Sequence, residues 1–184
     1  MRFKIITIFC ACMLGCLGII PKNNPAVVFD DGNHFGLLSK SLITNHDSYT
    51  WFPKQYDAYH PDLNGFDSAY LKQISIKIFM GTWCHDSKRE VPRLYKVLDE
   101  LYYDYENFEI IGLNKDKKGY FQDYTTFGIA NTPTFIFYRG DIEIGRIIEK
   151  PEGTLESHIQ NILKGNLCLQ KFQYLVEMAE WVKP

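Results

Sequence analysis

The residue of this sequence best suited to chemistry is Cys84, in the run Trp83-Cys84-His85-Asp86-Ser87. A thiol reacts as its thiolate, which unpaired N–H groups and the positive end of the dipole stabilise at the start of a helix. A protonated His85 would add positive charge, whereas Asp86 would oppose the thiolate unless its carboxylate turns away. Ser87 lies three residues on, on the same helix face, and can offer its hydroxyl to the sulfur. The run therefore predicts a single reactive thiol.

The elements that must position this run are those of an α/β domain. A helix is expected to begin near Cys84, because apolar residues recur at helical spacing from Val91 to Tyr102. Strand patterns cover 74–80, 108–113, 134–138 and, after a turn at 139–141, 142–148; further helices are expected at 120–127, after Thr154, and near 172–179. Parallel strands joined by a crossover helix and followed by a hairpin predict a mixed central sheet with helices on both faces.

The run around Cys84 resembles the active-site segment of the thioredoxin family, in which Trp-Cys-x-x-Cys opens a helix after a core strand. Pro92 stands where that family has a helix-kinking proline, and Thr132-Pro133 resembles its cis-proline facing the cysteine. The resemblance covers roughly 74–164, and the run also looks like thioredoxin-like proteins of bacterial envelopes. It implies a thioredoxin-like fold, with Trp83, Thr132 and Pro133 as substrate-binding residues. The backbone of Thr132 would then pair with an extended substrate.

Two departures from the family pattern bear on the chemistry. Ser87 replaces the second cysteine, so a mixed disulfide on Cys84 has no local thiol to resolve it. Ile78 stands where the family has a buried aspartate, which removes a nearby proton acceptor. A single thiol can still attack a disulfide and be released by glutathione, by a partner or by the substrate's own second thiol. Cys84, Ser87 and His85 are therefore the candidate catalytic residues, with Cys84 as the nucleophile.

Residues 1–21 have the layout of a signal peptide or lipoprotein leader. Arg2 and Lys4 precede an uncharged run at 5–20, which is shorter than the roughly twenty residues of a membrane span. Three of the five cysteines lie in this run, at positions 10, 12 and 16. The stretch Met13-Leu14-Gly15-Cys16 resembles a bacterial lipoprotein signal, which would make Cys16 a lipidated membrane tether. A plain leader and a signal anchor stay open as alternatives.

The rest of the chain is predicted to contain two parts. Residues 22–71 are expected to form a tether, over 22 to about 35, and an N-terminal helical extension with one or two short helices. Residues 72–184 are expected to form the thioredoxin-like domain with a C-terminal helix. That helix region contains Cys168, which is expected to be a core residue; a disulfide with Cys84 remains open.

Composition and spacing exclude several other classes of function. The net charge is −2 and no long basic run occurs, so no nucleic-acid partner is expected. The lysines at 115, 117 and 118 are expected to form a solvated loop, and Asp99 and Glu100 a solvated helix face. The five histidines lack paired ligand spacing, so no metal is predicted, and without a glycine-rich phosphate loop no cofactor is predicted either.

Two hypotheses of different classes follow. The first is a monothiol thiol–disulfide oxidoreductase or isomerase, exported to the periplasm or anchored as a lipoprotein of a bacterial envelope. Its partners would be protein thiols or disulfides, or a low-molecular-weight thiol. The second is a non-enzymatic thioredoxin-fold module that binds extended peptides beside Pro133. The first predicts a thiolate-reactive Cys84, and the second predicts normal function after Cys84→Ser.

Overall fold

The computed structural model describes residues 27–119 and 124–165, which form a six-stranded mixed sheet in the order β1-β2-β4-β3-β5-β6. The strands are β1 Val28–Asp30, β2 Asn33–Leu38, β3 Ile74–Met80, β4 Phe108–Gly112, β5 Thr134–Arg139 and β6 Ile142–Ile148. The α-helices are α1 Lys40–Asn45, α2 Trp51–Ala58 and α3 His85–Glu100, with a further helix over 155–165. Short 3-10 helices are η1 Asp47–Tyr49, η2 Ser68–Leu71, η3 Tyr105–Asn107 and η4 Thr125–Phe127.

The centre of the sheet is a parallel pair of strands joined by a helix. β3 and β4 run parallel, and α3 makes the crossover between them. On the other side of β3, β5 pairs antiparallel and continues through the turn at 140–141 into β6, also antiparallel. The strand positions agree with those predicted to within a residue or two. This element order confirms the predicted α/β, thioredoxin-like fold.

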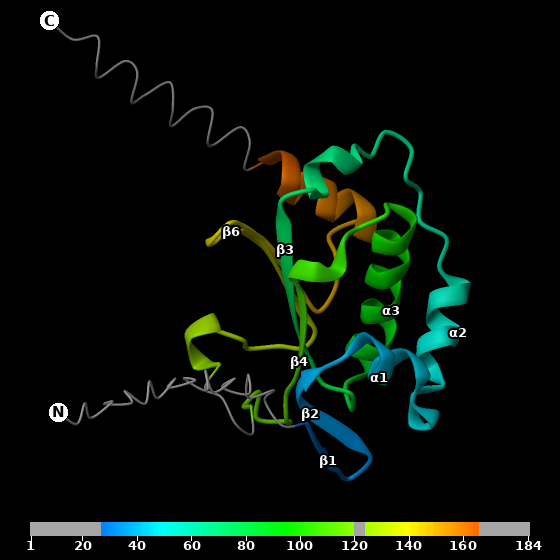
Figure 1. Cartoon of the computed structure of the whole chain (residues 1–184), viewed down its shortest axis with the longest axis vertical. Helices are drawn as coiled ribbons and strands as arrows, with labels where there is room; N and C mark the ends of the chain where they lie inside the picture. Colours follow the sequence, from blue (N-terminus) through cyan, green and yellow to red (C-terminus); the bar gives the residue numbers. More distant parts are fainter. Residues whose placement is uncertain (1–26, 120–123, 166–184) are drawn as a thin grey trace, which may run out of the picture.

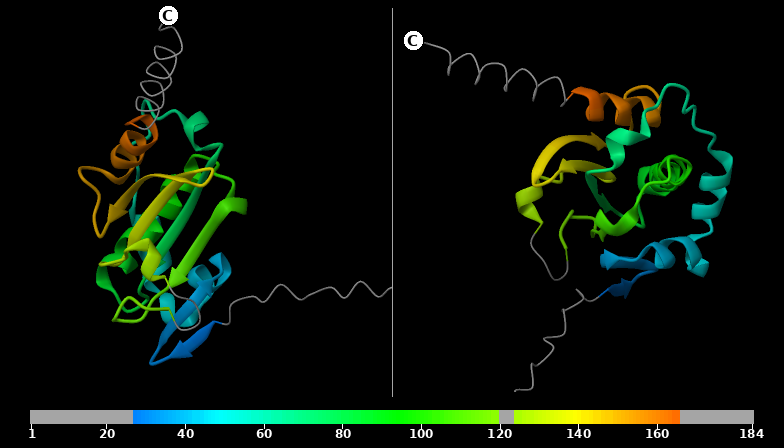
Figure 2. Two further views of the ribbon diagram at one scale, coloured as in Figure 1. Left: turned by 90° about the vertical axis from the view of Figure 1, so that its left-hand side faces the viewer. Right: turned by 45° about the horizontal axis from the view of Figure 1, so that its top comes forward.

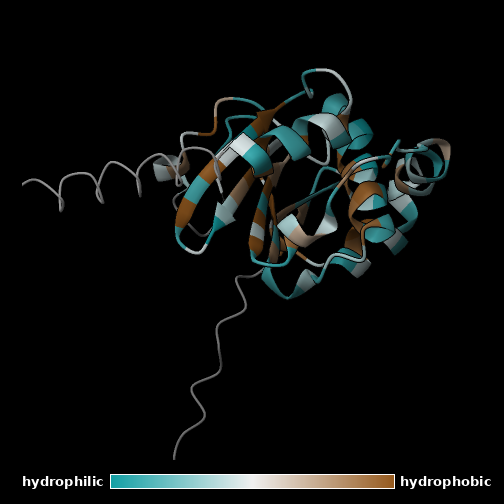
Figure 3. Ribbon diagram, turned by 90° about the horizontal axis from the view of Figure 1, so that it is seen from above, coloured by the Kyte–Doolittle hydropathy of each residue, from teal (hydrophilic) through white to brown (hydrophobic). Residues whose placement is uncertain are grey.

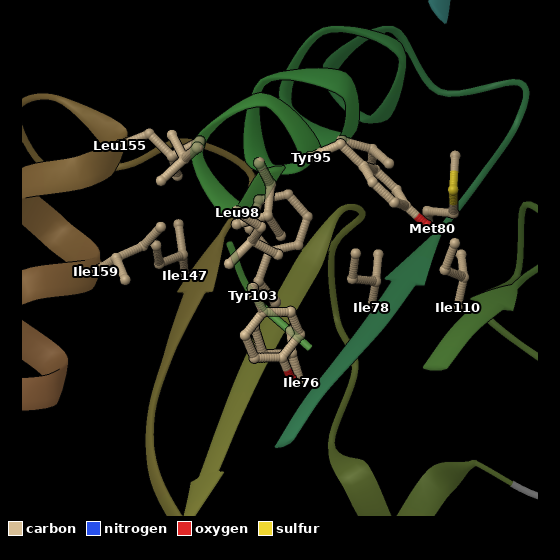
Figure 4. Close-up of a cluster of buried hydrophobic side chains, with 14 of the residues drawn as sticks. Ile76, Ile78, Met80, Tyr95, Leu98, Tyr103, Ile110, Ile147, Leu155 and Ile159 are labelled. Atoms are coloured by element: carbon tan, nitrogen blue, oxygen red, sulfur yellow. The ribbon is translucent and has the colours of Figure 1, made fainter. Parts of the chain in front are cut away.

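The main core lies between one face of the sheet and the helices. Ile76, Ile78 and Met80 alternate along β3 toward the same face and are fully buried. Figure 4 shows these side chains pointing toward Tyr95 and Leu98, on the helix side of the sheet. Figures 1 and 2 show α1, α2 and α3 on this same side. Apolar residues concentrate in the central strands, whereas the helices also carry polar residues (Figure 3).

The opposite face of the sheet is covered by a shorter segment. Phe79, Ile111 and Ile136 are buried there, and Tyr124 and Phe127 pack on them. Phe127 belongs to η4, which lies across the sheet from α3 in Figure 1. Helical segments therefore lie on both faces of the sheet, as predicted, although the face with α3 is covered far more extensively. Of the helix expected at 120–127, the described part is this 3-10 turn.

The segment expected to be a tether contributes two strands instead. β1 pairs antiparallel with β2, and β2 pairs antiparallel with β4, so residues from Val28 onward belong to the sheet. The turn between them is Asp31-Gly32, and both residues have positive φ (47° and 72°). Asp-Gly is a strong signal for a two-residue hairpin turn. The prediction of a linker is wrong from residue 28 on. The polar Asp31-Gly32 dipeptide is the turn of a hairpin and not part of a tether.

The remainder of the N-terminal extension wraps around α3. α1 and α2 are the short helices expected in this region, and Phe52 of α2 packs edge-on against Tyr95 of α3, with ring centroids 5.4 Å apart. Farther on, the Tyr59 hydroxyl donates to Glu156 at 2.6 Å, and the backbone N–H of Asp62 donates to the same carboxylate at 3.1 Å. The extension is thus tied to α3 and to the helix over 155–165.

Several predictions concern residues outside the described part of the chain. They are the leader at 1–21 with its three cysteines, the lipidation of Cys16, the core position of Cys168 and the helix near 172–179. Among residues 27–119 and 124–165, no helix is long and apolar enough to cross a membrane.

Replacing Tyr102 with glycine is expected to raise the free energy of unfolding by about 0.5 to 1 kcal/mol. Tyr102 follows α3 in the left-handed region (φ 54°), and its side chain is 95% exposed. A side chain is strained there, and Tyr102 buries little surface in return. Urea unfolding measures the change. Tyr102→Ala removes the ring but keeps the backbone strain, so it should be nearly neutral; equal stabilisation by both variants would refute the backbone explanation.

Candidate functional site

The site lies where β3 ends and β5 begins. Phe79 of β3 faces Thr134 of β5, so the residues after β3 and before β5 meet at one end of the sheet. After β3 the chain forms the loop Gly81–Cys84 and enters α3 at His85. The register therefore brings Cys84 beside the Thr132-Pro133 pair, although 48 residues separate Cys84 from Thr132 in sequence.

Cys84 is the N-cap of α3 and is partly buried. Its carbonyl accepts the first hydrogen bond of the helix, from the N–H of Lys88 at 3.0 Å. Its thiol donates to the carbonyl oxygen of Thr132 at 3.0 Å. A thiolate has no proton to donate, so ionisation would leave the sulfur facing that carbonyl. The reactive form must turn toward the free N–H groups of the helix start.

Ser87 is fully buried, and its hydroxyl oxygen accepts from the N–H of Gly81 at 3.2 Å. The hydroxyl proton is not used in that bond. Ser87 thus fastens the first turn of α3 to the start of the loop. Its hydroxyl proton remains available for the role toward the sulfur predicted from the sequence.

The two residues between Cys84 and Ser87 differ in exposure. The His85 side chain is 87% exposed, with its Nδ1 3.8 Å from a carboxylate oxygen of Asp86. Asp86 is held by Arg89 one turn along the helix, with an N–O distance of 2.8 Å. The arginine offsets the negative charge that Asp86 would otherwise present to a thiolate on Cys84.

Trp83 is fixed at the end of β4. Its indole N–H donates to the carbonyl of Leu113 at 2.9 Å, and the ring lies against Gly81. A Cβ atom at position 81 would lie 2.5 Å from the indole ring, so a side chain there would displace Trp83. The indole ring of Trp83 is therefore fixed in position and forms a wall of the site next to Cys84.

The Thr132–Pro133 peptide bond is cis, as the resemblance implied. Thr132 is buried, and its carbonyl is the acceptor for the Cys84 thiol. The carbonyl of Pro133 accepts from the N–H of Glu149, which follows β6, at 2.8 Å. All the candidate residues named from the sequence thus gather at this end of the sheet. Among them, the contact with the sulfur comes from Thr132.

Sequence reasoning missed the residues that hold the loop from the N-terminal side. The Thr82 hydroxyl accepts from the N–H of His34 at 3.2 Å and donates to Oδ1 of Asn33 at 3.0 Å. The His34 ring is hydrogen-bonded through Nδ1 to the Tyr49 hydroxyl at 2.5 Å. Burial, followed by the electrostatic effect of His46, lowers the pKa of His34 and so favours its neutral ring. No sequence motif joins these residues, since the sheet register alone brings them together.

The lysine-rich loop after β4 also lies near the site. The ammonium group of Lys117 lies 5.8 Å from the centroid of the Trp83 ring. The loop is closed by Asn114, whose side-chain oxygen accepts from the N–H of Lys118 at 2.9 Å. The loop therefore places at least one cation close to the wall formed by Trp83, a position that its solvated appearance in the sequence did not reveal.

Within the described residues, no group of three His, Cys, Asp or Glu side chains could hold a metal ion. Cys84 is a free thiol. The groups that the described residues place around this thiol are the Thr132 carbonyl, the Ser87 hydroxyl and the amides of the helix start.

No protein-family model matches this sequence, and no curated protein matches it. Similar solved structures include mitochondrial thioredoxin 3 of Saccharomyces cerevisiae, at 18% identity and TM-score 0.34, covering 60% of this chain and 98% of that one. Thioredoxin f2 of Chlamydomonas reinhardtii is 22% identical with TM-score 0.33, covering 48% and 80%. Thioredoxin O2 of Arabidopsis thaliana is 14% identical with TM-score 0.35, covering 53% and 81%. The fold assignment for this chain comes from its own sheet order and connections.

Proposed function

We propose that this thioredoxin-fold protein is a monothiol thiol–disulfide oxidoreductase or isomerase that acts through Cys84. The observation that carries the proposal is the position of this sulfur, at the N-cap of α3 and 3.0 Å from the Thr132 carbonyl. A partly buried thiol at the start of a sixteen-residue helix can be stabilised as a thiolate by the helix amides.

The reaction is an exchange in two steps. The Cys84 thiolate attacks one sulfur of a disulfide, forms a mixed disulfide with it, and releases the other sulfur as a thiolate. A second thiolate then attacks the mixed disulfide, forms a new disulfide with the bound partner and returns Cys84 as a thiolate. This second thiolate comes from the substrate itself, from a partner protein or from a low-molecular-weight thiol such as glutathione. Sulfur–sulfur bonds are exchanged without net gain or loss of electrons.

Each neighbour of Cys84 has a role in this proposal. The Thr132 backbone and Pro133 bind an extended substrate alongside the sulfur, and Trp83 forms the wall of the site. Ser87 offers its hydroxyl proton to the thiolate, and the exposed His85 contributes positive charge when protonated. A substrate that binds along Thr132 competes for the carbonyl that holds the thiol, which would release the sulfur for reaction.

We place this activity in a bacterial envelope, with export directed by the leader at 1–21. Lipidation at Cys16 would tether the domain to a membrane. Disulfides persist in such compartments, so a thiol of this kind would meet its substrates there. Labelling with a radioactive fatty acid in wild type and Cys16→Ser would distinguish a lipid tether from a plain leader or a signal anchor.

Alkylation of Cys84 is expected to remain fast down to about pH 6, whereas the rate at an ordinary thiol falls tenfold per unit below about pH 8.5. The measurement is the pH dependence of the iodoacetamide rate, followed on the Cys84-containing peptide by mass spectrometry. A small disulfide should then give a mixed disulfide on Cys84 that excess thiol removes. Cys84→Ser is the matched control and should form no such adduct.

One observation favours the second function, a peptide-binding module. The Cys84 thiol is satisfied by its bond to Thr132, a contact that only the protonated form can make. If this contact dominates, alkylation will follow an ordinary thiol or will fail in the folded protein. That result would reject the exchange chemistry and leave the peptide-binding module as the function.

A further inference from the structure

The loop that carries Cys84 is held by buried hydrogen bonds to the N-terminal hairpin. Thr82 is 1% exposed, and its hydroxyl uses both its accepting and its donating capacity, toward His34 and Asn33. These two residues precede Thr82 by 48 and 49 positions. They stand at the start of β2, beside the end of β4, where Gly112 allows the backbone of His34 to come close.

Tyr49 extends this connection into the helical part of the extension. Its hydroxyl is hydrogen-bonded to the ring of His34, and both side chains are more than nine-tenths buried. Its ring also contacts the rings of His46 and Trp51, at centroid distances of 5.2 and 5.3 Å. Buried hydrogen bonds therefore connect Tyr49 through His34 to Thr82, two residues before the reactive sulfur.

We propose that Asn33, His34 and Tyr49 are positioning residues for Cys84 and act through Thr82. Each of the other loop residues is fixed by a hydrogen bond. Gly81 donates to Ser87, and Trp83 donates to Leu113. Cys84 donates to the carbonyls of Gly81 and Thr132 through its N–H and its thiol. At Thr82 the corresponding hydrogen bonds are those to the N-terminal hairpin. Without these bonds the backbone on the N-terminal side of Cys84 is held less firmly, so the thiolate turns less readily toward the amides of the helix start. The consequence for disulfide exchange rests on the function proposed above.

Thr82→Val is the direct test, because valine has the shape of threonine but can neither accept from His34 nor donate to Asn33. We expect the alkylation rate of Cys84 at pH 6.5, relative to that at pH 9, to fall about tenfold in the full chain. Thr82→Ser keeps the hydroxyl and should restore the wild-type ratio. Tyr59→Phe removes a part-buried hydroxyl bond, to Glu156 and outside this cluster, and should leave the ratio unchanged.

These variants separate positioning from general loss of stability. The proposal would be overturned if the alkylation-rate ratio fell equally in Thr82→Val and Tyr59→Phe. It would also be overturned if Thr82→Ser did not keep the wild-type ratio. If Thr82→Val does not fold, Tyr49→Phe removes the hydroxyl that is bonded to His34 and should lower the same ratio in the same direction. An unchanged ratio in Tyr49→Phe would also count against the connection.

Hydrogen exchange separates this inference from the function it serves. The backbone N–H of Gly81 donates to the Ser87 hydroxyl of α3, and that of Cys84 donates to the carbonyl of Gly81. Their exchange should be about tenfold faster in Thr82→Val than in Thr82→Ser, whether or not Cys84 reacts with disulfides. If Cys84 is unreactive but the loop amides exchange faster in Thr82→Val, the proposed enzyme function is rejected and the positioning role of the hairpin stands. If Cys84 is reactive but the exchange rates are unchanged, the positioning role is rejected and the enzyme function stands.

Discussion

Ser87→Cys is expected to turn the single-thiol site into a dithiol site and to raise the reduction of protein disulfides by on the order of 100-fold. In wild type, a mixed disulfide on Cys84 waits for a thiol from outside. A cysteine at 87 would stand on the same face, one helical turn from Cys84, and would attack the mixed disulfide intramolecularly. The measurement is the rate of insulin reduction with excess dithiothreitol as electron source.

The geometry at Ser87 allows this change. Side chains at i and i+3 of a helix lie about 5–6 Å apart at Cβ, within reach of a disulfide after small adjustment. Ser87 is fully buried, and its oxygen accepts one bond, from the Gly81 N–H at 3.2 Å. Sulfur is a weaker acceptor, so the substitution should cost some loop stability but leave the helix in place.

The controls separate a resolving thiol from a mere loss of the hydroxyl. Ser87→Ala removes the hydroxyl and supplies no thiol, so it should gain nothing. Cys84→Ser combined with Ser87→Cys should be inactive, because the attacking sulfur is missing. Mass spectrometry would show whether Cys84 forms a disulfide with the thiol introduced by Ser87→Cys. If that disulfide forms and insulin reduction does not rise, then absence of a second thiol is not what limits this site.

Asp99→Ala is expected to lower the free energy of unfolding by about 2 to 4 kcal/mol, the largest stability effect we predict. Its carboxylate, on α3, accepts from the Tyr105 hydroxyl at 2.7 Å, the Tyr56 hydroxyl at 2.9 Å and the Lys40 ammonium at 3.0 Å. These donors come from η3, α2 and α1. One carboxylate therefore joins the N-terminal extension to the central helix, and its removal leaves three polar groups without their acceptor.

The same contacts give the stability a pH dependence. Burial raises the pKa of Asp99, but the bonds from Tyr105, Lys40 and Tyr56 outweigh it and hold the pKa below its ordinary value. The folded protein therefore binds this proton less readily than the unfolded chain. The contribution of Asp99 is complete above about pH 4 and is lost as the pH falls through the lowered value. Asp99→Ala should thus lose most stability at neutral pH and less near pH 2.

Glu100 provides the matched control, because it is the next residue on the same helix. Its carboxylate pairs with Lys96 at 3.4 Å and is 40% exposed. Such a surface pair contributes little, so Glu100→Ala should change the free energy of unfolding by about 0.5 kcal/mol or less. Urea unfolding of both variants at pH 7 and pH 2 is the measurement. Equal effects of the two substitutions would show that the bonds to Asp99 are not structural.

The contrast between Asp99 and Glu100 also shows how far helical periodicity can predict the surroundings of a side chain. Both were expected on a solvated helix face, and for Glu100 the structure agrees. Helical spacing gives the direction of a side chain relative to its own helix, but not what another segment places there. The donors to Asp99 come from residues 40, 56 and 105, the first two of them in a region whose irregular pattern predicted little beyond short helices.

The sequence by itself determined the central elements and the candidate site. The β-branched and aromatic runs at 74–80 and 134–138, the apolar stripe of α3 and the helix start at Cys84 are local signals, so the strands, the helix and their order could be predicted. The resemblance to thioredoxins then placed Thr132 and Pro133 opposite Cys84, and the sheet register confirms that placement.

Only the tertiary structure decided how the site is held. The link from Tyr49 through His34 to Thr82, the acceptor role of Thr132 and the position of Lys117 beside Trp83 all join residues distant in sequence. Hydrogen bonds of this kind depend on strand register and on the close approach of β2 to Gly112. Such hydrogen bonds produce no periodic pattern in the sequence. Each involves a single polar residue, and the fold alone determines which partner lies beside it.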